Sequence, residues 1–120
     1  MKIKSSKAKG RRLQNWVRDQ LRKIFVETTK VPRLEDDDIK SQTMGMPGED
    51  IILSPKAKQT IPYSFECKNV ERLNLWGALE QAETNCEDRV PVLVIKRNNT
   101  KTYAIIEFKE FARLIGGKYD

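Results

Sequence analysis

The sequence predicts a single domain of mixed α/β class, in which a β-sheet is flanked by helices. Apolar residues recur at the 3.6-residue period of a helix in one long N-terminal segment and in two shorter segments further along. Between these segments, alternating or continuous apolar residues predict strands. The expected order is a helix, a short strand, two strands, a helix, two strands and a helix. A chain of 120 residues encloses one modest core, so we expect residues 1–120 to form one domain.

The longest predicted helix covers about 8–26. Its apolar residues fall on one stripe that should enter the core, and they are Leu13, Trp16, Val17, Leu21 and Ile24. Residues 1–7 are basic and lack such a stripe, so they are predicted to be an arm that is mobile until it meets a partner. Gly10, near the start of the helix, allows either a close backbone approach or a frayed first turn.

Residues 27–49 show no clear period. A short strand is predicted over 39–42, followed by a Gly-, Met- and Pro-containing turn over 43–48. The four consecutive acids at 35–38 are typical of a solvated acidic loop far more often than of a metal site.

Two strands come next. The first begins at Asp50 and continues through 51–53, the second covers about 61–69, and residues 56–60 are expected to form the hairpin loop between them. Apolar residues alternate along the second strand, at Ile61, Tyr63, Phe65 and Cys67. The residues between them therefore point to the opposite face, and these are Ser64, Glu66 and Lys68.

The C-terminal half predicts four further elements: a helix over 75–83, a buried central strand over 90–95, a strand over 102–106 and a helix over 108–115. Asn74 is a candidate N-cap for the first of these. A turn is expected at Asn98 and Asn99. Trp76 lies at helical spacing with its apolar neighbours, which favours the core or a dimer interface over a wedge between DNA bases.

Composition excludes several classes of protein. The chain has no histidine, and its two cysteines, Cys67 and Cys86, form no CxxC pair, which argues against a zinc site, a disulfide scaffold and every histidine-dependent mechanism. No apolar run approaches the length of a membrane span, and the basic N-terminus lacks the apolar segment of a secretory signal. We therefore expect a protein of the reducing cytoplasm.

Charge is distributed unevenly along the chain. Residues 1–30 hold ten Lys or Arg and two acids, a net charge of +8, whereas residues 31–120 hold thirteen and fifteen, a net charge of −2, which gives the total of +6. This asymmetry predicts a basic N-terminal segment that meets a polyanion. A basic helix face that is merely solvated is an equally common explanation.

The strand positions also predict a site. If the two strands at 50–53 and 61–69 lie together, Asp50 and Glu66 converge on one divalent cation with Lys68 beside it, and this set suits phosphodiester cleavage. The alternatives are a turn-capping role for Asp50 and a surface ion pair between Glu66 and Lys68. Cys67 faces the core on the alternation argument and is read as a small hydrophobe.

Asp50, followed by Glu66-Cys67-Lys68 on the next strand and then a helix, resembles the PD-(D/E)XK nuclease superfamily, and the Gly48-Glu49-Asp50 entry most resembles its Holliday junction resolvase-like branch, which includes small phage-encoded members. The resemblance implies a restriction-endonuclease-like αβββαβ core and a Mg²⁺-dependent endodeoxyribonuclease, with Mn²⁺ as a substitute. It would act in the cytoplasm of a host cell.

The resemblance also implies individual roles. Asp50, Glu66 and the Cys67 carbonyl would bind the metal, Lys68 would orient the attacking water, and Gln81 would position water or phosphate. The family often has a glutamate on its first helix where this chain has Gln14. Glu49 or Asp19 is a candidate replacement for the missing charge.

The expected partner is DNA, with branched or junction DNA as the favoured form. Backbone phosphates would be contacted by Lys7, Lys9, Arg11 and Arg12, and also by Ser41 and Thr43, although turn capping is the commoner role of those two hydroxyls. Two symmetric cuts at a junction imply a homodimer, for which the second helix or the 90–95 strand could supply the interface.

Two other functions fit the same sequence. A nickase, a flap nuclease or a replication-associated nuclease would keep the chemistry and change the substrate. A non-catalytic nucleic-acid-binding protein would depend on the basic first helix and would not need Asp50.

Overall fold

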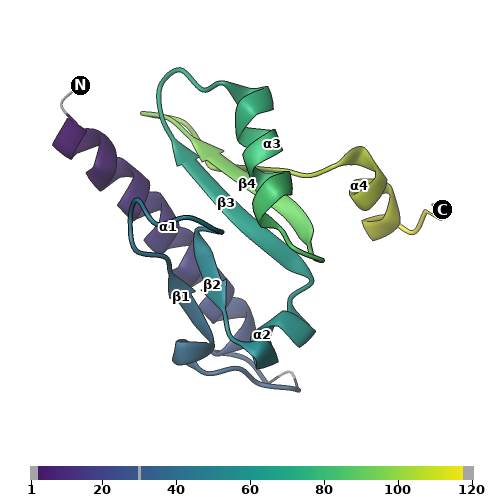
Figure 1. Ribbon diagram of the computed structural model, residues 1–120. Coiled ribbons are helices and arrows are strands. Elements are labelled where there is room, and N and C mark those ends of the chain that lie inside the picture. Colours follow the sequence, from purple (N-terminus) through teal and green to yellow (C-terminus); the bar gives the residue numbers. More distant parts are fainter. Residues whose placement is uncertain (1–2, 30, 118–120) are drawn as a thin grey trace.

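The computed structural model describes residues 3–29 and 31–117. In chain order its elements are α1 (Ile3–Phe25), a 3-10 helix (Asp36–Asp38), β1 (Ile39–Ser41), β2 (Ile51–Leu53), α2 (Pro55–Thr60), β3 (Tyr63–Asn69), α3 (Leu75–Asn85), β4 (Val90–Lys96), β5 (Tyr103–Ile105) and α4 (Phe108–Leu114). Strands lie between helices (Figure 1), which confirms the predicted α/β class and is consistent with a restriction-endonuclease-like core.

The strands form two ladders that meet beside Asp50. β1 and β2 are antiparallel, whereas β3 and β4 are parallel and β4 and β5 antiparallel, so β4 is the central strand of the second ladder. The Asp50 N–H donates to the Phe65 carbonyl at 3.0 Å and joins β2 to β3. The expected hairpin between these two strands is therefore wrong, because β2 pairs with β1 and β3 pairs with β4.

The segment expected to be that hairpin loop is the short helix α2. The Ser54 hydroxyl accepts a hydrogen bond from the Ala57 N–H at 3.0 Å, and Pro55 occupies the first turn. A serine cap followed by proline is a recognised start of a helix. The signal was therefore present in the sequence, and Ala57 is fully buried because α2 packs beside β2.

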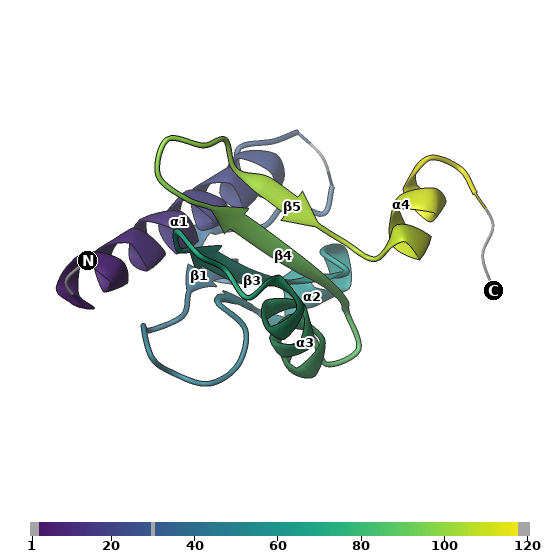
Figure 2. The same ribbon diagram turned by 90° about the horizontal axis from the view of Figure 1, so that it is seen from above.

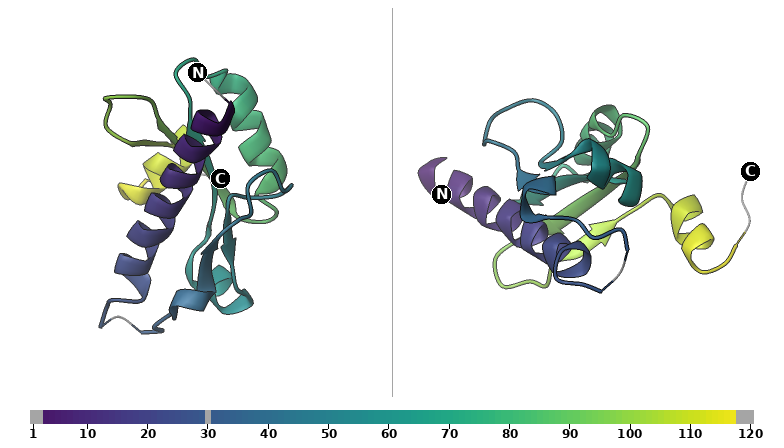
Figure 3. Two further views of the ribbon diagram at one scale, coloured as in Figure 1. Left: turned by 90° about the vertical axis from the view of Figure 1, so that its left-hand side faces the viewer. Right: turned by 90° about the horizontal axis from the view of Figure 1, so that it is seen from below.

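Helices α1 and α3 cover opposite faces of the strands (Figures 2 and 3). The face toward α1 carries the main apolar core, whose fully buried members include Leu34, Ile39, Ile51 and Ile61. Cys67 joins this core, as predicted. The alternating residues Ser64 and Glu66 face the other way, toward α3, and both are buried.

Helix α1 is longer than predicted. It begins at Ile3, so residues 3–7, which were expected to belong to a mobile arm, are helical. The segment contains Lys and Ala and no residue that would end a helix. Residues 1–2 lie outside the described residues. A Cβ at Gly10 would lie 3.2 Å from the Met44 Cε, so glycine permits the close approach of the 43–48 loop.

The apolar stripe of α1 divides into buried and exposed parts. Leu13, Val17 and Leu21 enter the core as predicted. Trp16 and Ile24 do not, since they are 47% and 48% exposed. Of the described helices, none is both long and apolar enough to cross a membrane.

The C-terminal half agrees more closely with prediction. The Asn74 side chain caps α3 by accepting from the Gly77 N–H at 3.1 Å, and β4 is buried over its central residues. The turn at Asn99 has a φ of 63°. Trp76 is 78% exposed, which excludes the core, while the dimer interface, its other predicted place, stays a prediction.

Helix α4 stands apart from the other elements (Figures 1 and 2) and is tied to β3 by one polar cluster. The Tyr63 hydroxyl donates to the Glu110 carboxylate, which also accepts from Arg113 at 2.7 Å. These two partners lower the pKa of Glu110 to about 2, with Arg113 making the larger contribution. The carboxylate is therefore ionised, and holds the cluster together, across the ordinary pH range.

Candidate active site

The predicted site residues surround a hollow of about 530 Å³ between α1, α3 and the 43–48 loop. Its walls bring together residues from four separate segments of the chain: α1, the 43–50 segment, β3 and α3. Those that the sequence predicted are Gln14, Thr43, Asp50, Glu66, Cys67, Lys68 and Gln81. Helices α1 and α3 bound this space on two sides.

Asp50 is fixed through both its backbone and its side chain. Its carbonyl accepts from the Gln42 N–H at 2.8 Å and from the Gln14 side-chain amide at 3.0 Å. Its carboxylate accepts from the Cys67 N–H at 2.7 Å. The Asp50 side chain is therefore held against β3 at Cys67, the residue that stands between Glu66 and Lys68 in the sequence.

Glu66 lies beside Asp50 and is only 3% exposed. Burial, followed by the nearby negative charge of Asp50, raises the pKa of Glu66 to about 7. Burial also raises the pKa of Asp50, against the lowering effect of the Cys67 N–H and of Lys68. Two carboxylates that each resist ionisation in one hollow are typical of a site that is completed by a cation.

Lys68 supplies the positive charge already present at this hollow. Its ammonium lies 3.9 Å from a Glu66 carboxylate oxygen and its side chain is 30% exposed. Lys68 lines the hollow next to the carboxylates and is partly exposed, so a ligand can reach its ammonium. This is the placement required of a group that acts on a bound anion.

The residues present fit a hard divalent cation. Within residues 3–29 and 31–117, no three His, Cys, Asp or Glu side chains cluster as a complete metal cage. Mg²⁺, however, is commonly held by one or two carboxylates together with water and substrate phosphate. Gln14 is 4% exposed, and its Oε1 is buried without a hydrogen-bond partner among the described residues, so an oxygen atom in the wall of the hollow remains available to a metal-bound water.

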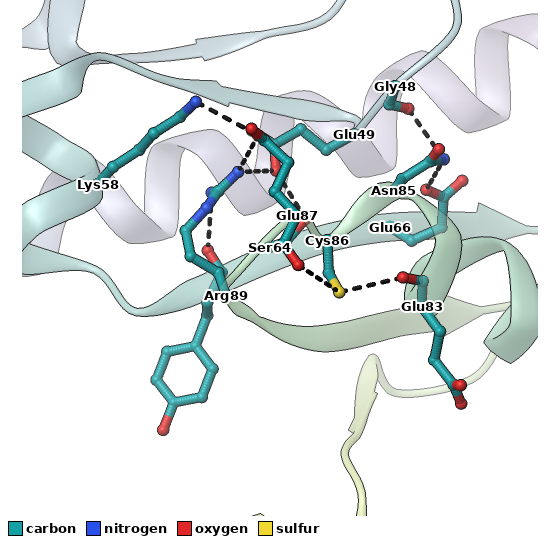
Figure 4. Close-up of polar contacts among 11 residues, drawn as sticks. Gly48, Glu49, Lys58, Ser64, Glu66, Glu83, Asn85, Cys86, Glu87 and Arg89 are labelled. Atoms are coloured by element: carbon teal, nitrogen blue, oxygen red, sulfur yellow. Dashed lines mark hydrogen bonds and ion pairs between the residues drawn. The ribbon is translucent and has the colours of Figure 1, made fainter.

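The two acids considered as substitutes for a first-helix glutamate are engaged elsewhere. Glu49 accepts from Arg89 at 2.6 Å and from the Ser64 hydroxyl at 2.6 Å (Figure 4). Asp19 pairs with its neighbour Arg18 at 2.9 Å. Neither acid lines the hollow, so both suggestions are wrong.

The residues expected to contact DNA phosphates differ in availability. Lys7, Arg11 and Arg12 are exposed on α1, as the prediction assumed. Lys9 is only 4% exposed and binds Glu71 at 3.0 Å, so it is not the free surface cation that was expected. Its position on α1 faces the strands, where an ion pair offsets the cost of burying the charge.

The two hydroxyl residues also differ from each other. The Ser41 hydroxyl donates to the Asn15 side chain at 2.8 Å and links β1 to α1. Thr43 is exposed and lines the hollow. Only Thr43 is therefore placed to meet a ligand bound at the carboxylates.

Asn85, at the end of α3, is a site residue that sequence analysis missed. Its side-chain amide donates to the Gly48 carbonyl at 3.2 Å and lies 3.4 Å from a Glu66 carboxylate oxygen (Figure 4). It thus links the 43–48 loop to Glu66. No local pattern marks this residue, because its partners lie far away in the sequence.

Replacing Asn85 with alanine should lower metal affinity or turnover by about 10–100-fold, because outer partners orient the groups that bind a metal. Isothermal titration with Mn²⁺ and cleavage assays would measure the two effects. Thr84→Ala is the matched control, since among the described residues the Thr84 hydroxyl bonds within its own helix, to the Glu80 carbonyl. Equal behaviour of the two variants would contradict a positioning role for Asn85.

Comparison with known proteins bears on the identity of this chain. No curated protein and no solved structure matches it. A family model does match, over residues 5–118, and its description is "Phage putative PDDEXK endonuclease". The match covers nearly the whole chain and includes every residue of the carboxylate hollow. The chain therefore belongs to this phage family of PD-(D/E)XK endonucleases.

Proposed function

We propose that the protein is a Mg²⁺-dependent endodeoxyribonuclease whose preferred substrate is branched DNA, in particular the four-way junction. The main support is one observation: Asp50 and Glu66 lie side by side in a hollow, with the Lys68 ammonium 3.9 Å from Glu66. Membership of an endonuclease family adds that the chemistry is cleavage of a nucleic-acid chain. As a phage enzyme, it would act on DNA in the cytoplasm of the host cell.

In this proposal Asp50, Glu66 and the Cys67 carbonyl hold the cation. Bound Mg²⁺ or Mn²⁺ would polarise the scissile phosphate and lower the pKa of a water molecule. Lys68 orients the attacking water and stabilises the negative charge that develops on the phosphate oxygens. Gln81 and Thr43, both exposed at the hollow, position the phosphate by hydrogen bonding.

A junction-resolving role requires a second active site, and we propose a homodimer. Large apolar side chains are exposed on α3 and α4, including Trp76 at 78% and Phe108 at 69%. These surfaces support an interface formed by the helices. The 90–95 strand is a poorer candidate, because β4 is paired on both edges.

The decisive experiment measures cleavage of labelled four-way junction, flap, nicked and linear duplex DNA, with Mg²⁺, with Mn²⁺ and with EDTA. We expect paired, symmetric cuts in the junction and loss of these cuts with EDTA. Asp50→Asn should remove cleavage and retain junction binding, because the amide keeps the side-chain shape but removes a charge needed to hold the metal.

Each result discriminates between the candidate functions. Preferential cleavage of flaps or nicked duplex would replace the junction assignment with another nuclease of the same superfamily. Salt-sensitive binding without metal-dependent cleavage of any substrate would favour a non-catalytic binding protein. In that case the exposed Arg11 and Arg12 would be essential and Asp50 would not.

A further inference from the structure

A second hollow lies on the other flank of α1, away from the carboxylates. It has a volume of about 520 Å³ and is bounded by α1, the end of β3 and the turn between β4 and β5. Figure 2 shows that turn beside α1. Gly10 and Gln14 line the carboxylate hollow, whereas Arg12 and Trp16 line this one. The thickness of one helix, about 10 Å, thus separates the two hollows.

The walls of the second hollow are basic and aromatic. Arg12 and Arg97 are exposed, and neither side chain makes a hydrogen bond or ion pair with another part of the described chain. Trp16 is 47% exposed here instead of entering the core. None of the residues lining the hollow is acidic, although Glu71 lies close by, where it binds Lys9 and the Asn98 N–H.

The turn that forms one wall is held in a fixed shape. The Lys96 ammonium donates to the Thr100 carbonyl at 2.6 Å, and the Thr100 side chain accepts from the Arg97 N–H at 3.1 Å. Glu71 accepts from the Asn98 N–H at 2.8 Å while it pairs with Lys9 at 3.0 Å, so it ties the turn to α1. The pKa of the Glu71 carboxyl is lowered, chiefly by the Asn98 N–H and Lys9 and to a smaller extent by the charge of Arg97, but no hydrogen bond or ion pair ties the Arg97 side chain to the rest of the described chain. The two exposed arginines and the indole are therefore held on an ordered helix and an ordered turn, which lowers the entropic cost of binding.

A buried acceptor adds an independent indication of a ligand. Asn69 is 9% exposed and belongs to the lining of the hollow. Its amide nitrogen donates to the Lys9 carbonyl at 3.1 Å, but its Oδ1 is buried without a donor among the described residues. Buried acceptors normally have a partner, so a donor from outside the chain is expected at this position.

We propose that the second hollow binds an unpaired nucleotide of the DNA substrate. The indole of Trp16 stacks on the base, while Arg12 and Arg97 bind the flanking phosphates. Stacking on an aromatic ring needs a base that is free of its duplex partner, and it tolerates any base identity. The two hollows are separated by the width of α1, so an unpaired base in the second hollow would lie close to the bond that is cut in the first. The site would therefore favour DNA whose strands separate near the cut.

This proposal rests on the proposed function for the identity of the polymer, but its test needs no cleavage. The chain has two tryptophans, so Trp76→Phe leaves Trp16 as the sole indole reporter and Trp16→Phe leaves Trp76. Each variant would carry Asp50→Asn and be titrated in EDTA with oligothymidine of about 10 nucleotides, a length within the range of single-strand sites. Fluorescence anisotropy of the labelled oligonucleotide would give the affinity in parallel.

We expect oligothymidine to quench the Trp16 fluorescence and to leave the Trp76 fluorescence unchanged. Trp16→Ala should weaken binding about 10-fold. Arg97→Ala should also weaken binding and lower the salt-dependence slope by about 1. Lys109→Ala is the charge-matched control, since this exposed lysine lies on α4, and its affinity should stay close to that of the parent.

Three results would overturn the proposal: unchanged Trp16 fluorescence at saturation, equal quenching by duplex of the same length, or equal effects of Arg97→Ala and Lys109→Ala. Failure of the nuclease assignment gives a different pattern. In that case wild-type protein would cut no DNA in any metal, while Trp16 quenching by oligothymidine would persist and the second hollow would stand.

Discussion

Glu66→Gln should abolish DNA cleavage and, in the same protein preparation, raise the melting temperature of the metal-free protein at pH 8. Cleavage should fall by more than about 100-fold, because changing even an outer partner of a metal ligand costs about 10–100-fold. The stability effect has the opposite sign. Glu66 is 3% exposed, so at pH 8 the fold holds a buried carboxylate beside Asp50, and glutamine removes that charge.

The pH dependence follows from the raised pKa. The Glu66 carboxyl, whose ordinary pKa is 4.5, has a pKa of about 7 in the folded protein, chiefly through burial. A raised pKa means that the neutral form is preferred on folding, so its contribution is complete below pH 4.5 and is lost as the pH rises through 7. The gain on substitution, up to about 3 kcal/mol at pH 8, should therefore vanish near pH 4.

Thermal melts in EDTA at pH 4, 6 and 8 would measure this effect. Glu80→Gln, which changes an exposed glutamate of α3 itself, is the matched control and should show no pH-dependent gain. Added Mn²⁺ should stabilise the wild type and not Glu66→Gln, because only a folded protein with both carboxylates binds the ion tightly. An active Glu66→Gln protein would refute the assigned role of this residue.

Arg89→Met should destabilise the protein by about 3–5 kcal/mol, because it leaves the largely buried Glu49 carboxylate without its cation. The two side chains are 5% and 11% exposed and lie 2.6 Å apart. Arg89 also donates to the Tyr63 carbonyl at 3.2 Å, so its loss loosens the start of β3. Figure 4 shows Arg89 at the centre of this network. Chemical denaturation would measure the loss.

The double variant Glu49→Gln/Arg89→Met separates the charge effect from packing. Much of the stability should return, because glutamine can still bond to the Ser64 hydroxyl and no unpaired charge remains. Arg89 also pairs with the exposed Glu87, at 3.1 Å. Lys58→Met is the control for that contact, because Lys58 pairs with the same glutamate at 3.3 Å, and this exposed pair should contribute no more than about 1 kcal/mol. A small effect of Arg89→Met would mean that water reaches Glu49 easily.

The parts of the site that sequence analysis predicted are those set by one strand. Alternation along β3 placed Glu66 and Lys68 on the face away from Cys67, and the structure agrees, because a period of two follows from strand geometry alone. The closeness of Asp50 to Glu66 required a second strand to lie alongside. The two strands were expected to form a hairpin, and they do not. Asp50 comes close to Glu66 because its N–H bonds to the Phe65 carbonyl on β3.

The parts that could not be predicted depend on contacts between distant segments. Lys9 and Arg12 are both basic residues of α1, and only packing against the strands decides that the first is buried with Glu71 and the second is exposed. Trp16 was placed in the core because large apolar residues on a helical stripe usually go there. The turn between β4 and β5 instead forms a hollow beside it.

The multiple attachments of Asp50 also have a consequence for the newly synthesised chain. Its backbone and carboxylate join α1, the β1–β2 ladder and β3 through Gln14, Gln42, Phe65 and Cys67. These are the same contacts that assemble the carboxylate hollow, so the hollow and the junction of the two ladders form together. On the proposed function, an incompletely folded chain would contain Asp50, Glu66 and Lys68 but would not yet be able to cut DNA.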